Sequence, residues 1–309
     1  MRIEQIPELF GVKGATGIVE VSTGHINRTF LVTCGGQRYV LQSLNRGVFR
    51  LPETVMANIA QVEQAFSGSR EVTVPHFLTC DGRNYASDGD EIWRMYAYCE
   101  SAPCDEQLFR TGFAYGRFIR IMSTSQARIE PVISGFHDLG GYFEKLRMVC
   151  PEGEIPSLLK ETEKRLRSCF EGVPVRIIHG DAKTDNIIIG ETCTVLDLDT
   201  VMTSYAALDY GDLVRSVCGG GFSAEKVGEV TRGFVEGTGD LLTARERETL
   251  SLGVLWVVCE LAVRYLTDYY SPVRYFRGRT REQCLVRSKE LISQLEAFLA
   301  AEQQFSDIV

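Results

Sequence analysis

The sequence predicts an α+β fold in two parts, a small β-rich part followed by a larger, mainly helical one. Runs rich in β-branched and aromatic residues dominate the first hundred residues, whereas apolar residues at helical spacing dominate most of the rest. At 309 residues the chain is long for one domain and comfortable for two. The segment E-S-A-P-C-D near residue 100 has the composition of a linker. We therefore expect one domain over residues 1–99 and a second over residues 100–309.

The first part is expected to be a small sheet with one helix inserted after its third strand. Cys34-Gly35-Gly36 joins the second and third strands as a hairpin turn. Pro52–Phe66 carries apolar residues at helical spacing, with proline in its first turn, and is the expected helix. The expected strands are Gly17–Ser22, Arg28–Val32, Gln37–Leu44, Val72–Leu78 and Glu91–Tyr98.

The second part is expected to be helical, with a short β-rich insertion. Ala244–Tyr270 has the strongest helical pattern, and Thr243 with Glu246 forms a capping box at its start. Three short β-branched runs, Val175–Ile178, Ile187–Ile189 and Thr194–Leu196, predict small hairpins. The other expected helices are Gln107–Met122, Phe136–Val149, Ser157–Phe170, Ala207–Val217, Glu225–Glu236 and Cys284–Gln303.

Composition and charge exclude several classes of function. A formal net charge of −8 argues against nucleic-acid or anionic-membrane partners, because both require a basic face. The cysteines are dispersed without a C-x-x-C pair, which favours free thiols in a reducing compartment over a zinc site. The first residues contain no apolar signal core, and the apolar run Leu252–Cys259 is too short to span a bilayer. We expect a cytoplasmic protein.

A polar loop between two of the short β-branched runs carries the strongest functional signal. It holds Asp181, Lys183 and Asn186 within six positions, and Asp197 follows at the end of the third run. Phosphoryl transfer needs a carboxylate beside the acceptor hydroxyl, cations near the phosphate oxygens, and hard oxygen ligands for Mg²⁺. The spacing H-x-D-x-K-x-x-N followed by L-D is more specific than any of its members. It predicts a site for phosphate and a divalent metal.

The order I-I-H-G-D, D-N-I-I-I and V-L-D-L-D resembles the catalytic loop of protein-kinase-like phosphotransferases of the aminoglycoside phosphotransferase and choline kinase type. G-H-I-N-R-T-F, Y-V-L-Q-S-L-N-R-G-V-F, W-R-M-Y-A-Y, D-Y-G-D-L-V-R and R-Y-L-T-D-Y are similar to the bacterial N-acetylhexosamine 1-kinases. The resemblance runs over about residues 20 to 290. It implies a bilobal protein-kinase-like fold that uses ATP and Mg²⁺ to phosphorylate a small metabolite, a hexosamine or related sugar at O1. Such a protein would be a monomer or a homodimer.

The resemblance also implies roles for individual residues. Asp181 would be the catalytic base, Asn186 and Asp197 the Mg²⁺ ligands, and Lys183 the cation near the γ-phosphate. The nucleotide would contact a turn over Gly24–Asn27, a hinge over Tyr96–Glu100, and Gln42; the residues we single out are Gly24, His25, Asn27, Gln42, Tyr98 and Cys99. Four others, His179, Asp199, Asp209 and Asp212, would orient the loop. Arg264 and Asp268 would lie in the acceptor pocket, or form a surface ion pair at helical i, i+4 spacing.

Two departures from the family pattern qualify this reading. Gln42 stands where most such kinases have a lysine on the third strand, so the clamp on the phosphates lacks one cation; Arg46 and Lys183 are candidates to supply it. The loop has H-G-D where N-acetylhexosamine kinases are expected to have H-N-D, so the identity of the acceptor is left undecided.

Three alternatives therefore remain. In the first, the protein is a kinase whose acceptor is choline, an aminoglycoside or homoserine. The arginines near the C-terminus fit a neutral or anionic acceptor better. A catalytically weak, pseudokinase-like nucleotide-binding module is suggested by Gln42, but Asp181, Asn186 and Asp197 argue against it. A glycosyltransferase with Asp197-Leu198-Asp199 as its metal motif is disfavoured, because no alternation of strand and helix precedes it.

Overall fold

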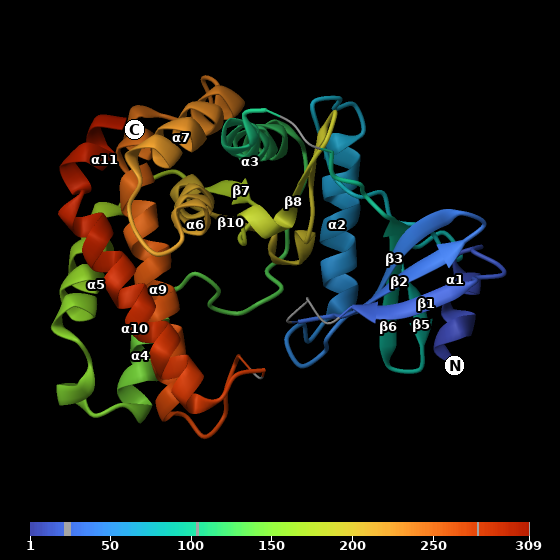
Figure 1. The fold of residues 1–309 in the computed structure, drawn as a ribbon, viewed down its shortest axis with the longest axis horizontal. Coiled ribbons are helices and arrows are strands. Elements are labelled where there is room, and N and C mark those ends of the chain that lie inside the picture. Colours follow the sequence, from blue (N-terminus) through green and yellow to red (C-terminus); the bar gives the residue numbers. More distant parts are fainter. Residues whose placement is uncertain (22–25, 103–104, 277, 309) are drawn as a thin grey trace.

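The computed structural model describes residues 1–21, 26–102, 105–276 and 278–308. The N-terminal part contains an antiparallel five-stranded sheet in the order β1-β2-β3-β6-β5, which lies at one end of the molecule (Figure 1). Its strands are β1 (Gly17–Val21), β2 (Arg28–Cys34), β3 (Gln37–Ser43), β5 (Ala86–Asp88) and β6 (Glu91–Ala97). One face of the sheet packs on α1 (Ile6–Leu9) through a small core that includes Leu41 and Trp93. The opposite face is directed towards the rest of the chain.

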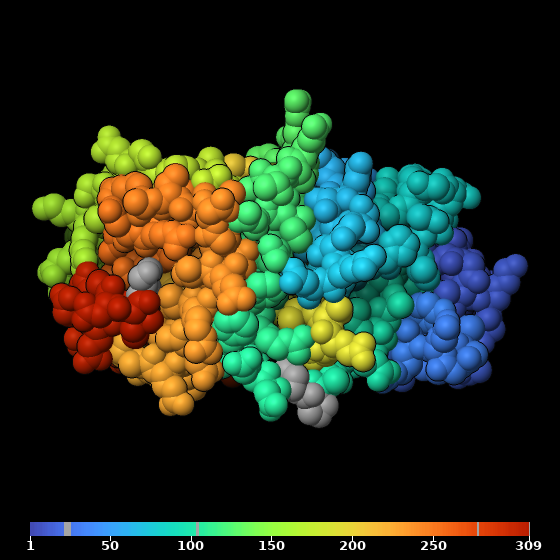
Figure 2. Space-filling model, turned by 90° about the horizontal axis from the view of Figure 1, so that it is seen from above, coloured from blue at the N-terminus to red at the C-terminus, as the bar shows by residue number. Residues whose placement is uncertain are grey.

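Helix α2 (Pro52–Phe66) follows the third strand, as predicted, and lies between the sheet and the helical part (Figure 1). Its buried residues Val55, Met56 and Ile59 belong to the large core cluster of the C-terminal part. The side chain of Asn58, which is 2% exposed, donates to the Glu130 carbonyl at 2.8 Å and accepts from the Glu130 amide at 3.0 Å. Figure 2 shows α2 next to the segment between α3 and α4, to which Glu130 belongs, on the surface of the molecule. The helix thus ties the two parts together.

The predicted strand Val72–Leu78 is wrong over most of its length. Only β4 (Val72–Thr73) is a strand, and it pairs in parallel with β9 (Cys193–Val195) of the C-terminal part. Pro75 offers no backbone N–H for a ladder, which accounts for the early end. Strand β5, which the sequence analysis missed, takes the fifth place in the N-terminal sheet.

The C-terminal part is built from helices around a short β region. Two predicted helices are each interrupted: the structure breaks Ala244–Tyr270 at Thr249 and Cys284–Gln303 at Ala301. The capping box of Thr243 and Glu246 is confirmed. The helices are α3 (Gln107–Thr124), α4 (Leu139–Val149), α5 (Ser157–Cys169), α6 (Ala206–Cys218), α7 (Ala224–Thr238), α8 (Ala244–Glu248), α9 (Leu250–Tyr270), α10 (Arg281–Ala300) and α11 (Glu302–Ile308).

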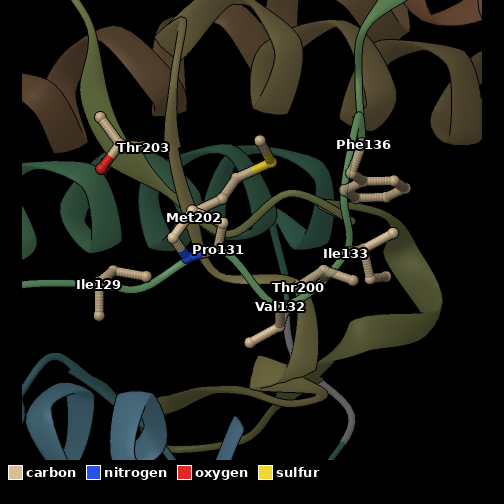
Figure 3. A pocket seen from close by; sticks show the side chains of 8 residues that line it. All are labelled: Ile129, Pro131, Val132, Ile133, Phe136, Thr200, Met202 and Thr203. Carbon is tan, nitrogen blue, oxygen red and sulfur yellow. The ribbon is translucent and has the colours of Figure 1, made fainter. Parts of the chain in front are cut away.

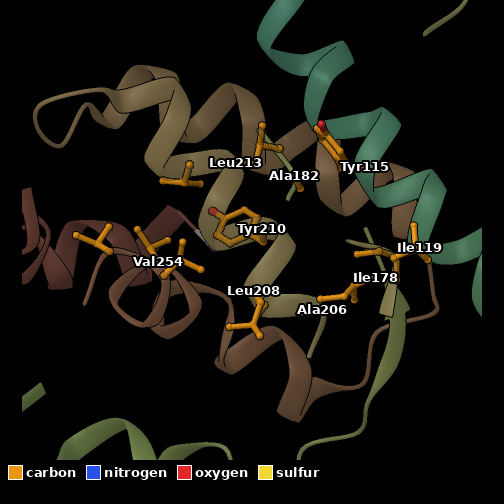
Figure 4. Packing of buried hydrophobic residues seen from close by; sticks show 14 of the residues in the cluster. Tyr115, Ile119, Ile178, Ala182, Ala206, Leu208, Tyr210, Leu213 and Val254 are labelled. Carbon is orange, nitrogen blue, oxygen red and sulfur yellow. The ribbon is translucent and has the colours of Figure 1, made fainter. Parts of the chain in front are cut away.

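Helices α6 and α9 form the centre of this part. A Cβ on Gly253 of α9 would lie 1.9 Å from the Ala207 carbonyl oxygen of α6, so glycine is required for this close approach. Tyr210 of α6 packs among buried residues such as Leu213 and Val254 (Figure 4). Helix α9 is long and apolar enough to cross a membrane, but 67% of its most apolar window is buried inside the protein. It therefore serves as a core helix here.

The short strands lie between α2, α3 and α6 (Figure 1). β8 (Ile187–Ile189) pairs with β9 as a hairpin, and its predicted bounds are confirmed. β7 (Arg176–Ile178) pairs instead with β10 (Met202–Ser204), which was not predicted. The loop from β7 to β8 and the turn from β9 to β10 are thereby brought side by side, facing the N-terminal sheet.

Candidate active site

The loop after β7 is fixed from three sides. Asp209 of α6 is 1% exposed and accepts hydrogen bonds from the amides of His179 (2.7 Å) and Gly180 (2.8 Å). His179 is fully buried, and its Nε2 donates to the Leu196 carbonyl at 2.7 Å. The hydroxyl of Tyr115, on α3, donates to the Lys183 carbonyl at 2.8 Å. These bonds leave the loop little freedom.

Asp212 lies one turn further along α6 than Asp209 and pairs with Arg215 at 2.7 Å instead of contacting the loop backbone.

The backbone contact at Gly180 accounts for the H-G-D form of the loop. Gly180 has φ +81°, and a Cβ there would lie 2.4 Å from the Thr200 carbonyl oxygen. Any other residue would combine left-handed backbone strain with a clash against backbone. The glycine therefore reflects how closely the loop approaches the turn after β9.

Asp181 is held by two groups from its own loop. Lys183 Nζ donates to Asp181 Oδ2 at 2.7 Å, and Asn186 Nδ2 donates to the same oxygen at 2.8 Å. Burial alone would raise the pKa of Asp181, but Lys183, His179 and Asn186 outweigh it and hold this pKa below its ordinary value. Among the described residues Oδ1 accepts no hydrogen bond. Asp181 is thus an ionised carboxylate with one oxygen available to a ligand.

Asn186 and Asp197 present oxygens suited to a hard cation. With Nδ2 of Asn186 committed to Asp181, its Oδ1 makes no hydrogen bond within the described part of the chain. Asp197 has φ +55°, faces open space, and makes no side-chain hydrogen bond to a described residue. The protein that surrounds it on its other sides reduces its hydration and, with the nearby charges of Asp199 and Asp181, raises the pKa of Asp197 to about 6.

These two oxygens do not make a complete cage. No three His, Cys, Asp or Glu side chains of the described residues gather as a metal site. Mg²⁺ in phosphate-transfer sites is ordinarily bound by one or two protein oxygens, with substrate phosphates and water completing the shell. The donor set of Asn186 and Asp197 fits that mode of binding.

Asp199 points away from this open site. It is 3% exposed and forms a two-pronged ion pair with Arg94 of β6, in which Nη2 donates to Oδ2 at 3.1 Å. Asn27 Nδ2 donates to the same oxygen at 2.7 Å. The sequence analysis missed Arg94, because a charged residue that alternates with apolar ones is the ordinary pattern of a strand with one exposed face.

Gln42 lies beside this ion pair. Its Oε1 accepts from Arg94 Nε at 2.9 Å, and its Nε2 donates to Thr29 Oγ1 at 3.1 Å. Arg46, one candidate for the missing cation, is occupied elsewhere by Glu53 (3.1 Å) and the Asp90 carbonyl.

The sheet face directed towards the C-terminal part bears two rows of cross-strand neighbours. Val19, Leu31, Val40 and Tyr96 are paired across β1, β2, β3 and β6, and all of them are partly or well exposed. The neighbouring row is Val21, Thr29, Gln42 and Arg94. An apolar row therefore borders a polar row.

The predicted hinge residues follow β6. Tyr98 is 40% exposed; its amide donates to the Arg38 carbonyl at 3.0 Å, and its ring lies 4.2 Å from the Arg38 guanidinium carbon. Cys99 is half-buried. Gly24 and His25, predicted to cover the phosphates, lie outside the described residues.

His137 is a second residue that the sequence analysis missed. Its Nε2 donates to the Gly180 carbonyl at 2.9 Å, next to Asp181, and its Nδ1 lies 3.0 Å from Glu260 of α9. Glu260 also pairs with Arg264 at 3.2 Å. Burial alone would lower the pKa of His137, but Glu260 outweighs it and the pKa is raised to about 9. The imidazolium therefore links α9 to the loop that carries Asp181.

The Arg264 side chain is 9% exposed and pairs with Glu260, and Asp268 is buried, so the predicted surface ion pair between Arg264 and Asp268 is wrong. The guanidinium carbon of Arg264 lies 4.7 to 5.6 Å from the ring centres of Phe136, Tyr142, Tyr275 and Phe276. Asp268 is 4% exposed and accepts from the amides of Tyr275 (3.0 Å) and Phe276 (2.7 Å). It holds the segment that follows α9.

Two hollows adjoin the site. A polar one of about 610 Å³ begins at Lys183 and is lined by Thr184, Asp185, Arg215, Ser216, Gly219, Gly220, Arg287, Glu290, Ser293 and Gln294. A smaller apolar one of about 80 Å³ lies beside the turn after Asp199, between Ile129–Phe136 and Thr200–Thr203 (Figure 3). The polar hollow is the larger space beside the catalytic loop.

Comparison with known proteins agrees with this geometry. The model of the phosphotransferase enzyme family matches residues 17–246. A microcompartment-associated aminopropanol kinase has a similar structure, with 18% identity, TM-score 0.72, and 98% of this chain and 97% of that chain covered. A choline/ethanolamine kinase family protein from Mesorhizobium loti has 20% identity and TM-score 0.63, covering 96% and 95%. An amicoumacin kinase in complex with AMP-PNP and Ca²⁺ has 14% identity and TM-score 0.68, covering 95% and 93%. At such identities, the likeness to these structures shows a shared fold.

Proposed function

Because the chain belongs to the phosphotransferase enzyme family, we propose that it transfers the γ-phosphate of ATP, with Mg²⁺, to a hydroxyl of a small sugar-like metabolite. The observation that carries this proposal is the arrangement of Asp181, Lys183 and Asn186 on one rigid loop facing Asp197. A carboxylate, a cation and two metal-binding oxygens are the parts that phosphoryl transfer requires.

The loop residues divide the work of the reaction. The acceptor oxygen forms a bond to the γ-phosphorus while the bond from that phosphorus to the bridging oxygen of ADP breaks, and the acceptor proton passes to Asp181. Lys183 keeps Asp181 ionised beforehand and places a positive charge near the transferred group. Asn186 and Asp197 would hold Mg²⁺, which neutralises charge on the phosphate oxygens when bound.

The N-terminal sheet supports a place for the nucleotide. The partly exposed apolar row of Val19, Leu31, Val40 and Tyr96 suits a flat base, and the hinge at Tyr98 and Cys99 follows directly from β6. The polar row is joined through Arg94 to Asp199 and so lies beside the turn that carries Asp197, where the phosphates would meet the metal. We propose that ATP lies across these two rows.

The surroundings of the polar hollow favour a neutral, hydroxylated acceptor such as a hexosamine or related sugar. Each of its cations already pairs with a carboxylate, Lys183 with Asp181, Arg215 with Asp212 and Arg287 with Glu290. The hydroxyl and amide groups that line the hollow suit sugar hydroxyls. The aromatic rings that would attract choline already surround Arg264. A cationic acceptor therefore finds no vacant aromatic cage among the described residues of that region.

An amino alcohol is the second candidate, because kinases of aminopropanol and of the choline/ethanolamine family share this fold. Asp185 and Glu290 would then pair with the ammonium group. ATP consumption should be measured with neutral sugars, hexosamines, amino alcohols, homoserine and aminoglycosides as separate acceptors. We expect turnover with a hexosamine or related sugar. Turnover confined to amino alcohols or aminoglycosides would reject the sugar assignment, and Mg²⁺-dependent ATP binding without turnover on any acceptor would indicate the pseudokinase-like alternative.

A further inference from the structure

The face of the N-terminal sheet that is directed towards the C-terminal part carries a deeply buried cation on β6. Arg94 lies on β6 directly opposite Gln42 of β3, and its side chain is 2% exposed. Directly opposed residues of an antiparallel pair share one face of the sheet, so both side chains are directed towards the C-terminal part. Gln42 orients the guanidinium by accepting from Nε at 2.9 Å.

The partner of Arg94 belongs to the turn that carries Asp197. Both terminal nitrogens of Arg94 donate to the carboxylate of Asp199, which lies only two residues after Asp197 in the chain. Asn27 adds a bond of 2.7 Å to Asp199, and its own Oδ1 accepts from the Asn45 amide at 3.0 Å. Every described side-chain contact of Asp199 therefore comes from the N-terminal part.

This arrangement has two consequences for Asp197. The two-pronged contact fixes the orientation of the turn, because a planar guanidinium matches a carboxylate in one geometry. The charge of Arg94 also offsets that of Asp199, which would otherwise repel a second carboxylate nearby.

We propose that Arg94 is a positioning residue of the metal site, which holds the Asp197–Asp199 turn against the sheet and supplies from β6 the positive charge that residue 42 of β3 lacks. The proposal rests on the proposed function, since it concerns the metal bound with the nucleotide. It assigns Gln42 the role of orienting Arg94.

The test is nucleotide-dependent thermal stabilisation, which requires no acceptor. The shift in Tm is followed as MgCl₂ is added at a fixed excess of AMP-PNP. We expect R94Q to need about 10- to 100-fold more Mg²⁺ for half of the maximal shift, the cost usual for removing a group that orients a metal ligand. R94K keeps the positive charge but loses the two-pronged contact with Asp199, so its Mg²⁺ requirement should lie between those of R94Q and the wild type.

The exchange variant Q42R/R94Q separates this role from general destabilisation. Because the two positions face each other on one sheet face, an arginine at position 42 should reach Asp199 and recover most of the Mg²⁺ response. R176Q serves as the matched control: Arg176 also makes a two-pronged ion pair, with Glu246 at 2.8 and 2.9 Å, and its loss should lower Tm without changing the Mg²⁺ requirement.

The possible outcomes separate a failure of the proposed function from a failure of the role proposed for Arg94. If the wild type shows no Mg²⁺-dependent stabilisation by AMP-PNP, the proposed function fails. If the wild type responds and folded R94Q responds at the same Mg²⁺ concentration, the role of Arg94 is overturned. An exchange variant that needs as much Mg²⁺ as R94Q would overturn the claim that β6 supplies the charge missing from β3. If R94Q does not fold, R94K and the exchange variant decide the same points.

Discussion

Asn186 donates a hydrogen bond of 2.8 Å from Nδ2 to Oδ2 of Asp181, so one amide both orients the proposed base and offers its own Oδ1 to a metal. The variant N186A removes both contributions. We expect it to lower turnover and to raise the Mg²⁺ requirement of the reaction by about 10- to 100-fold. A titration of the steady-state rate with Mg²⁺ measures both effects.

The control for this variant is N84A. Asn84 is also partly buried and donates to a backbone carbonyl, that of Met56 at 3.0 Å, but it lies in the N-terminal part away from the loop. N84A should lower stability and leave the Mg²⁺ requirement unchanged. An equal Mg²⁺ response in both variants would contradict the role given to Asn186.

Gly180 is predicted to be required for both stability and activity. G180A would introduce a Cβ 2.4 Å from the Thr200 carbonyl oxygen at a backbone φ of +81°. We expect a loss of at least about 1–3 kcal/mol in the free energy of unfolding, together with a marked loss of turnover, because the next residue is Asp181. Urea unfolding and steady-state kinetics measure the two effects.

Gly172 supplies the comparison, since it has φ +72° and a Cβ there would meet nothing within 4 Å. G172A should show the backbone strain alone, with turnover preserved. If G180A and G172A lose the same stability and both keep wild-type turnover, the close contact between Gly180 and Thr200 is not required for activity.

His137 predicts a specific pH dependence of stability. Its pKa is raised from 6.5 to about 9 on folding, so the stabilisation by its ion pair with Glu260 is fully present below about pH 6.5 and is lost as the pH rises to about 9. This difference corresponds to about 3 kcal/mol. The unfolding free energy of the wild type should fall over this range more steeply than that of H137Q, which cannot titrate.

Denaturant unfolding at a series of pH values tests this prediction. H76Q is the control, because the His76 side chain is 87% exposed and its loss should leave the wild-type slope intact. Parallel curves for the wild type and H137Q would show that the buried pair with Glu260 does not carry the pH dependence.

Asp268 offers a test of the acceptor assignment. Both of its carboxylate oxygens accept backbone amides, from Tyr275 and Phe276, so D268N should destabilise the segment after α9. We expect a lower Tm, with a smaller effect on the KM for the acceptor. A large increase in this KM at unchanged Tm would instead support the direct acceptor contact that the family resemblance implies.

The local features of the chain were predictable from sequence, because their signals lie within a few residues. Helix α2, strand β8 and the capping box at Thr243 follow from spacing and turn chemistry alone. The loop with Asp181, Lys183 and Asn186 was identified in the same way, and the structure brings these three side chains into contact.

The long-range features were not predictable in this way. Arg94 and Asp199 are 105 residues apart, and His137 lies 43 residues from Gly180 and 123 from Glu260. β4 leaves the N-terminal sheet to pair with β9, a choice made by tertiary packing and not by strand propensity. Contacts of this kind leave no mark on local periodicity, so a single sequence does not reveal them.

The most direct test of the account is the turnover of D181N with an acceptor that the wild type phosphorylates. Asn keeps the size of Asp181 but accepts no proton, so we predict a loss of about 100-fold or more in kcat. Stabilisation of D181N by Mg²⁺ and AMP-PNP should persist, because Asn186 and Asp197 remain. Turnover near the wild-type rate would contradict the central claim that Asp181 is the base of this kinase.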